Sequence, residues 1–181
     1  MLSKEEAQKW RDKAYALLKR AGIVITEREK KSIETADFGL GIYDKIGLGV
    51  LVYVNTKRCC AKELALLPWQ ICPEHRHPPI SKTNLGKEET FRCRWGEAYL
   101  YVPGKKCAKP HAKIPEEKKE YFTVWHEIVL KPGIQFTLAP DTLHWFQAGP
   151  QGAVISEFST TSVDEKDIFT DSEIQRITKV Y

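Results

Sequence analysis

From residue 39 to residue 158 the chain is a succession of short runs of β-branched and aromatic residues, separated by Gly, Pro and Asn. Runs of this length between turn residues are typical of a β-sandwich or β-barrel and are too short for regular helices. We expect the runs to form enough strands to close a small barrel: 49–54, 63–68, 70–77, 90–95, 97–102, 121–130, 133–138, 144–148 and 152–158.

The first 36 residues are predicted to be helical instead. Ser3 and Glu6 have the spacing of a capping box, and apolar residues follow at helical intervals until Gly22. Thr26 and Glu29 repeat the box at the start of a second, shorter helix. The 181 residues suit one domain, with a helical extension at 1–36, a barrel at 39–160 and a C-terminal tail at 161–181.

Charge and cysteine content exclude several classes of protein. The 28 basic and 24 acidic residues are interspersed, so the net charge of +4 forms no stripe for nucleic acid. The charged start has no apolar signal region and no stretch reaches the ~18 apolar residues of a membrane span, which predicts a cytoplasmic protein. The cysteines are odd in number and lack a CxxC pair, which indicates reduced thiols without a disulfide framework or zinc knuckle. Cys72 lies near His75, but it precedes Pro73 in an apolar run, which favours a buried side chain over a catalytic nucleophile.

Three histidines have the pattern of a metal site. On an extended strand, residues two apart project from the same face, so His75 and His77 aim at one point while Arg76 points away. His144 follows a turn at the head of a later strand. We interpret His126, which alternates with apolar neighbours, as solvent-facing, and His111 as part of an exposed polar excursion at 104–120.

A carboxylate is expected to complete the ligand set. Glu88 and Glu89 both lie at the start of an expected strand. Glu89 is favoured by its spacing to Gly96, which lies in an expected hairpin turn at 95–97, with six residues between the two. Three imidazoles and one carboxylate suit Mn, Fe, Co, Ni or Zn, and leave two adjacent positions of an octahedral ion open to water or substrate. We therefore predict His75, His77, Glu89 and His144 as metal ligands.

These motifs resemble those of the cupin superfamily, although the gap between His77 and Glu89 is longer than usual, which we interpret as a loop insertion. More specifically, the chain resembles the bacterial D-lyxose isomerases, and the likeness runs from the helical start to residues 167–171. It is carried by PEHRHPP at 73–79, GKEETFRCR at 86–94, TVWHE at 123–127 and HWFQAG at 144–149.

The resemblance implies a cupin jelly-roll barrel, manganese as cofactor and a homodimer. It also implies interconversion of D-lyxose with D-xylulose, and of D-mannose with D-fructose, by proton transfer through a metal-stabilised enediol. A non-haem metal dioxygenase of the cupin superfamily, which would consume oxygen, and a non-catalytic sugar-binding cupin remain alternatives.

Proton transfer requires a base beside the metal. Glu157, in the apolar run 152–158, is our first choice, although an outward-facing charge on an alternating strand is an equal alternative. Lys87 and Lys62 are candidates for steadying the oxyanion or relaying the hydroxyl proton. Aromatic side chains could line the sugar site, and the candidates are Trp69, Phe91, Tyr101, Trp145 and Phe146.

Overall fold

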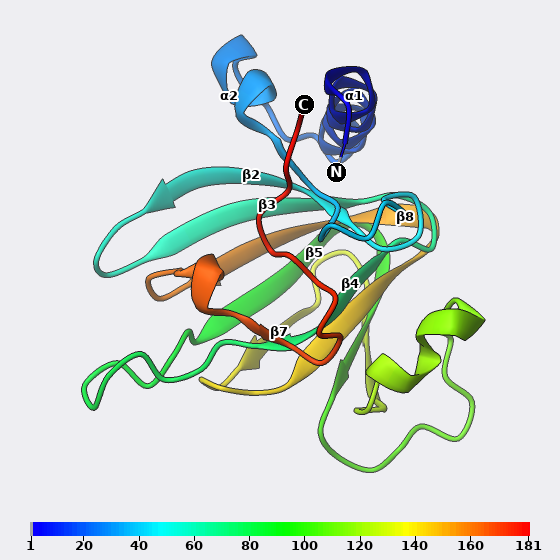
Figure 1. Ribbon diagram of the computed structural model, residues 1–181, viewed down its shortest axis with the longest axis vertical. Coiled ribbons are helices and arrows are strands. Elements are labelled where there is room, and N and C mark those ends of the chain that lie inside the picture. The colour runs from blue at the N-terminus through cyan, green and yellow to red at the C-terminus, as the bar shows by residue number, and fades with distance from the viewer. Residues whose placement is uncertain (1) are drawn as a thin grey trace.

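The computed structural model describes residues 2–181 and is built around one curled antiparallel sheet (Figure 1). The strands are β1 (Glu34–Ala36), β2 (Leu48–Asn55), β3 (Cys60–Leu66), β4 (Ile71–Arg76), β5 (Glu89–Val102), β6 (His126–Leu130), β7 (Gln135–Leu138), β8 (His144–Ser159) and β9 (Ile168–Phe169).

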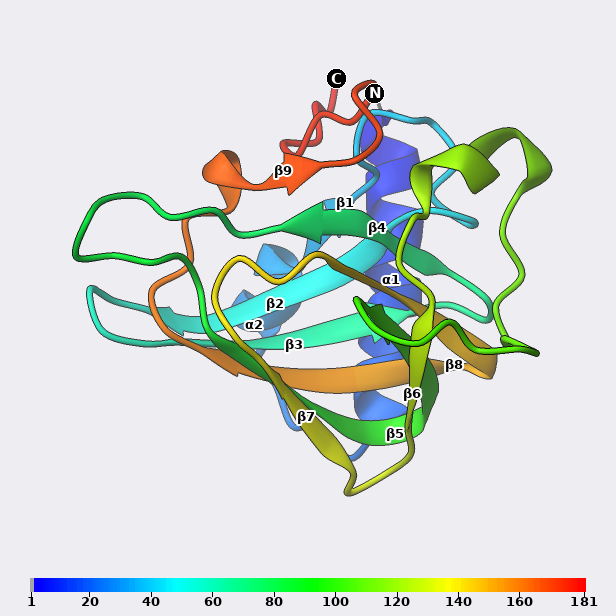
Figure 2. The same ribbon diagram turned by 90° about the horizontal axis from the view of Figure 1, so that it is seen from below.

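Two long strands, β5 and β8, take part in both halves of the curled sheet. In one half the order is β1-β2-β3-β8-β5-β7, and in the other it is β9-β4-β8-β5-β6. The two halves face each other, as the view in Figure 2 shows. A cluster of buried apolar side chains fills much of the space between them. The mainly β, barrel-like architecture expected from the sequence is therefore present.

Glycines allow β5 and β8 to bend where they cross. Gly96 has φ of 69°, and a Cβ atom there would lie 2.1 Å from the carbonyl oxygen of Gly152, whose own φ is 90°. Only residues without a side chain tolerate this approach. The prediction of a hairpin turn at 95–97 is therefore wrong, because Gly96 bends a strand that continues on both sides of it. For the same reason 144–148 and 152–158 form a single strand, β8.

The N-terminal helices lie outside the sheet. Helix α1 (Lys4–Arg20) and helix α2 (Glu27–Ser32) both begin with the predicted capping boxes. The apolar face of α1, which includes Leu17 and Leu18, packs on the outer surface of β2, β3 and β8 (Figure 1). Within residues 2–181, no helix is long and apolar enough to cross a bilayer.

The last segment of the chain folds back over the sheet instead of trailing away. Residues 161–181, expected as a tail, contain the 3-10 helix η2 (Asp164–Lys166) and β9, which pairs with β4. The polar excursion after β5 likewise contains a 3-10 helix, η1 (Glu116–Tyr121). The segment that follows η1 is held by Glu74 of β4, whose carboxylate accepts hydrogen bonds from the backbone of Thr123 and Val124.

Candidate active site

Three histidines meet inside the curled sheet. His75 on β4 and His144 on β8 are cross-strand partners, and His77 lies one residue beyond the end of β4. One ring nitrogen from each histidine lies within 4.8 Å of the others, and all three side chains are buried. Arg76 points away and pairs with Asp141 at the surface, as the alternation of a strand predicts.

Each of these rings is oriented by a hydrogen bond from Nδ1. The Nδ1–H of His75 donates to the carbonyl of Pro73 at 2.8 Å, and that of His144 donates to the carbonyl of Thr142 at 2.9 Å. His77 uses the carboxylate of Asp167. Such bonds fix the tautomer that leaves the Nε2 lone pair available to a metal.

Glu89, the first residue of β5, adds a buried carboxylate. Its Oε1 lies 3.1 Å from Nε2 of both His77 and His144, whereas Glu88 is exposed. Oε1 of Glu89 and those two Nε2 atoms have no hydrogen-bond partner among residues 2–181, whereas Oε2 of Glu89 is paired with Lys87. Buried polar atoms are rarely left in this state, so the donor set fits a divalent cation between them.

The protonation of this cluster follows from burial and charge. Burial and the neighbouring His144 and His77 rings lower the pKa of His75 well below its usual value, so its imidazole is neutral. Burial would raise the pKa of Glu89, but Lys87 and the histidines hold it well below its usual value. Burial would lower the pKa of His77, yet Glu89 and Asp167 raise it to about 9, so a cation that binds Nε2 of His77 displaces a proton.

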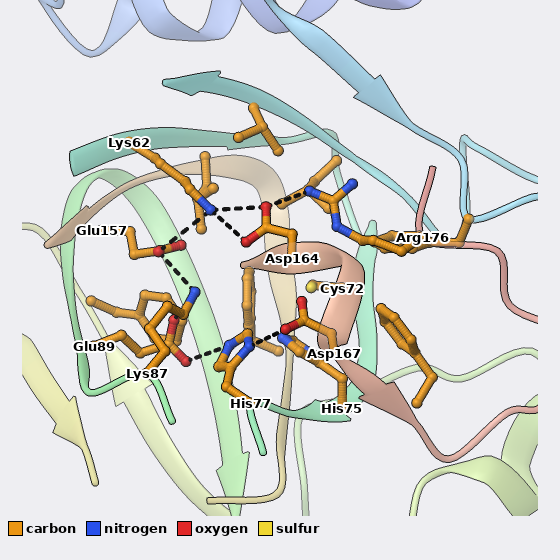
Figure 3. Close-up of a pocket in the computed structure, with 17 residues that line it drawn as sticks. Lys62, Cys72, His75, His77, Lys87, Glu89, Glu157, Asp164, Asp167 and Arg176 are labelled. Carbon is orange, nitrogen blue, oxygen red and sulfur yellow. Dashed lines mark hydrogen bonds and ion pairs between the residues drawn. The ribbon is translucent and has the colours of Figure 1, made fainter. Parts of the chain in front are cut away.

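A chain of alternating charges leads away from Glu89 (Figure 3). Lys87 Nζ lies 2.7 Å from Glu89 Oε2 and 3.0 Å from Glu157 Oε1. Lys62 Nζ lies 3.9 Å from Glu157 Oε1 but 3.0 Å from both oxygens of Asp164. Asp164 in turn accepts a hydrogen bond from Arg176 at 2.8 Å. The structure thus brings Glu157, Lys87 and Lys62 together beside the histidines.

The surroundings keep Lys87 and Asp164 ionised. Burial opposes the charge of Lys87, but Glu157 and Glu89 hold its pKa well above its usual range. Burial likewise opposes the charge of Asp164, but Lys62 and Arg176 hold its pKa far below its usual range. Cys72, which lines the same cavity, is a thiol because burial raises its pKa. A cysteine nucleophile is therefore not available here.

Only some of the expected aromatic side chains reach the cavity. Phe91 and Phe146 line it together with Phe38 and Phe169. The described residues that line the cavity do not include Trp69, Tyr101 or Trp145. The rings of Tyr101 and Trp145 stack on each other at 4.0 Å in the core, and the ring of Trp69 lies under Lys113 near the surface. The sequence did not reveal this, because bulges in β4, β5 and β8 change which face a side chain takes.

Four residues that line the cavity come from the last segment of the chain and were not predicted. They are Asp164, Asp167, Phe169 and Arg176. The available signal was the resemblance itself, which extended over residues 167–171, but the polar composition of this segment indicated only a tail.

The curled antiparallel sheet and the buried histidines define a cupin-like protein with a candidate metal centre. A D-lyxose ketol-isomerase of Thermofilum sp. (strain ex4484_79) is 62% identical to this chain over 180 residues. A D-lyxose/D-mannose isomerase of Thermosediminibacter oceani is 57% identical over 180 residues. Each match covers 99% of this chain and 99% of the relative. The chain belongs to the D-lyxose ketol-isomerase family of sugar isomerases, which confirms the family expected from the motifs. No protein-family model matches the chain.

Solved structures are similar in fold. The L-ribose isomerase of Cellulomonas parahominis superposes with a TM-score of 0.83 at 16% identity, covering 99% of this chain and 98% of that one. The L-ribose isomerase of Acinetobacter sp. DL28 in complex with L-ribose gives a TM-score of 0.81 at 16% identity with the same coverage. The expected cupin-like fold with helices outside the sheet is therefore confirmed.

Proposed function

We propose that this isomerase interconverts D-lyxose with D-xylulose, and D-mannose with D-fructose. The observation that carries the proposal is the full-length identity of 62% and 57% to a D-lyxose ketol-isomerase and a D-lyxose/D-mannose isomerase. The side chains that such a reaction needs, a metal site beside a carboxylate and two ammonium groups, occupy one cavity of this chain.

The proposed cofactor is Mn²⁺, held by His75, His77, Glu89 and His144. These ligands would also accept Co²⁺, Fe²⁺, Ni²⁺ or Zn²⁺. A bound divalent cation supplies Lewis-acid stabilisation of the negative charge that develops on the sugar oxygens. The structural support for this assignment is that Nε2 of His77, Nε2 of His144 and Oε1 of Glu89 face one another without hydrogen-bond partners among the described residues.

Glu157 is the proposed base. Isomerisation moves the proton on C2 to C1 while the C1 carbonyl becomes a hydroxyl and the C2 hydroxyl becomes a carbonyl. One carboxylate can take the proton from C2 and return it to C1, so that it ends the cycle unchanged. Glu157 lies in the cavity, and Lys87 holds its Oε1 at 3.0 Å, which restricts its rotation.

The two lysines have different surroundings and therefore different proposed roles. Lys87 is held between two carboxylates, which suits it to orient Glu157 and Glu89. Lys62 is hydrogen-bonded to Asp164 and to Ser162 Oγ at 2.9 Å, and it faces Glu157 across a longer distance. We assign it to the proton exchange between the two sugar oxygens.

The proposed substrate contacts are Phe91 and Phe146. Phe91 is the cross-strand neighbour of Glu157, and its ring centroid lies 5.2 Å from that of Phe146. These rings form an apolar wall next to the charged chain, which suits a sugar whose carbon skeleton packs on one side while its hydroxyl groups face the other.

The test is incubation of the purified protein with Mn²⁺ and D-lyxose under anaerobic conditions, followed by detection of D-xylulose. D-mannose and L-ribose are assayed in parallel, and a His144→Ala variant serves as the control for contaminating isomerases. Ketose from D-lyxose without oxygen supports the proposal and contradicts a dioxygenase. Retention of metal with no ketose from any of these sugars would overturn it. A homodimer and a cytoplasmic location also remain proposals.

A further inference from the structure

The segment after η2 runs antiparallel to β4, the strand that carries His75 and is followed directly by His77. In the pairing of β9 with β4, Phe169 is opposite His75 and Ile168 is opposite Arg76. Continuing this register by one residue places Asp167 opposite His77. Asp167 is buried to the same degree as His77, with side-chain exposures of 7% and 8%.

His77 differs from the other two histidines in the source of its Nδ1 partner. His75 and His144 each donate to a carbonyl two residues earlier in their own chain segment. His77 donates to Asp167, which is 90 residues away in the sequence. The orientation of this one ring therefore depends on the docking of a distant segment (Figure 3).

The docking is itself fixed from within β4. Buried Glu74, the neighbour of His75, accepts a hydrogen bond from Thr170 Oγ1 at 2.7 Å, and its carbonyl accepts one from Thr170 N at 3.1 Å. Asp167 is thus held between η2 on one side and this anchor on the other, which fixes its backbone beside His77.

We propose that Asp167 is a positioning residue of the metal site, which fixes the His77 ring with Nε2 toward the ion and increases the basicity of that nitrogen. The inference rests on the proposed function and adds to it a residue supplied by the tail. Carboxylates that accept from a ligating imidazole act in this way, and their loss weakens metal binding about 10–100-fold.

The experiment measures Mn²⁺ binding without sugar, by the electron paramagnetic resonance signal of free Mn²⁺ during titration of metal-free protein. We expect Asp167→Asn and Asp167→Ala to weaken binding by about 10–100-fold. Asp171→Asn is the matched control, because Asp171 is a buried carboxylate of the same tail that pairs with Lys118 at 2.8 Å, outside the described lining of the cavity. It should bind Mn²⁺ within about twofold of the wild type.

A purely structural role for Asp167 predicts a different result. A structural role would lower the thermal midpoint of the metal-free protein and leave the Mn²⁺ affinity of the folded fraction unchanged. A positioning role lowers that affinity and also changes the visible spectrum of the Co²⁺-loaded protein. Wild-type affinity in the folded Asp167→Asn variant would overturn the inference, as would a wild-type protein that binds no Mn²⁺. Wild-type Mn²⁺ binding without isomerisation of D-lyxose would contradict the proposed function alone, and the affinities of the variants would still decide this inference.

Discussion

Glu157 is flanked by two ammonium groups, yet only one is in direct contact with it. Lys87 is 3.0 Å away, whereas Lys62 is held at 3.9 Å by its hydrogen bonds to Asp164. Asp164 is fixed in turn by Arg176. The proposed base is therefore in close contact with only one of these two cations.

The role of Glu157 can be tested by an isosteric change. Glu157→Gln should retain Mn²⁺ and lose turnover by about 10²–10⁴-fold, because the amide cannot accept the proton from C2. Metal content and the rate of ketose formation are measured on the same preparation. Glu63→Gln is the matched control, since Glu63 lies on the neighbouring strand β3 next to Lys62 and outside the described lining of the cavity. Full activity of Glu157→Gln would assign the base to another residue.

The clustering of the proposed metal ligands was predictable because it depends largely on short-range geometry. The period of two along a strand places His75 and His77 on one face, and the choice between Glu88 and Glu89 agrees with which of them is buried. The roles of Trp69, Tyr101 and Trp145 were not predictable, because they depend on bulges and on the docking of the 104–125 loop. Asp164 and Asp167 depend on a contact between segments about 90–100 residues apart in sequence, for which local patterns carry no information.

At the scale of elements, local signals predicted the helices better than the long strands. The capping boxes are satisfied by neighbouring residues, so Ser3 and Thr26 mark the starts of α1 and α2 correctly. Gly96 and Gly152 were interpreted as ends of strands, because a glycine that bends a strand has the same local signature as one in a turn. Only the close approach of β5 and β8 distinguishes the two.

The crossing of β5 and β8 gives a prediction for stability. Gly96→Ala should destabilise the protein by more than about 3 kcal/mol, because the new Cβ atom would meet the Gly152 carbonyl and φ is positive. Gly133→Ala is the control, since Gly133 also has a positive φ of 88° but has nothing within 4 Å of the added atom. It should cost only about 1–2 kcal/mol. Equal losses in urea unfolding would contradict the steric argument.

Glu63 on β3 predicts a dependence of stability on pH. Burial raises its pKa, and the hydrogen bonds from Ser156 only partly offset this. The native state therefore holds the proton more tightly than the unfolded state, so stability decreases as the pH rises above the unfolded pKa of about 4.3. Glu63→Gln should remove this loss and raise the thermal midpoint by roughly 2–4 °C at pH 7. At pH 4 and below the gain should vanish, and a gain independent of pH would contradict this origin.

At the scale of the whole molecule, the site joins segments from most of the chain. Its lining comes from the segment before β2, from β2, β3, β4, β5 and β8, from the loop between β4 and β5, and from the tail. A ligand bound at such a junction stabilises the native state by about 2.7 kcal/mol at a hundredfold excess over its dissociation constant.

Removal of metal should therefore lower the thermal midpoint. Chelation with EDTA is expected to reduce it by roughly 5–10 °C relative to the Mn²⁺-loaded protein, as scanning calorimetry can measure. The His75→Ala variant provides the control, because its midpoint should not respond to Mn²⁺. A response equal to that of the wild type would place the stabilising ion elsewhere.

One strand, β8, carries both His144 and Glu157. A single stretch of backbone thus sets the separation between a proposed metal ligand and the proposed base. Side chains alternate between faces along a strand, so inserting or deleting one residue between these two would turn one of them out of the cavity. Residues 79–85, the mostly exposed part of the loop between His77 and Glu89, are under no such constraint. Length changes among descendants of a common ancestor should accumulate in that loop and be absent from β8.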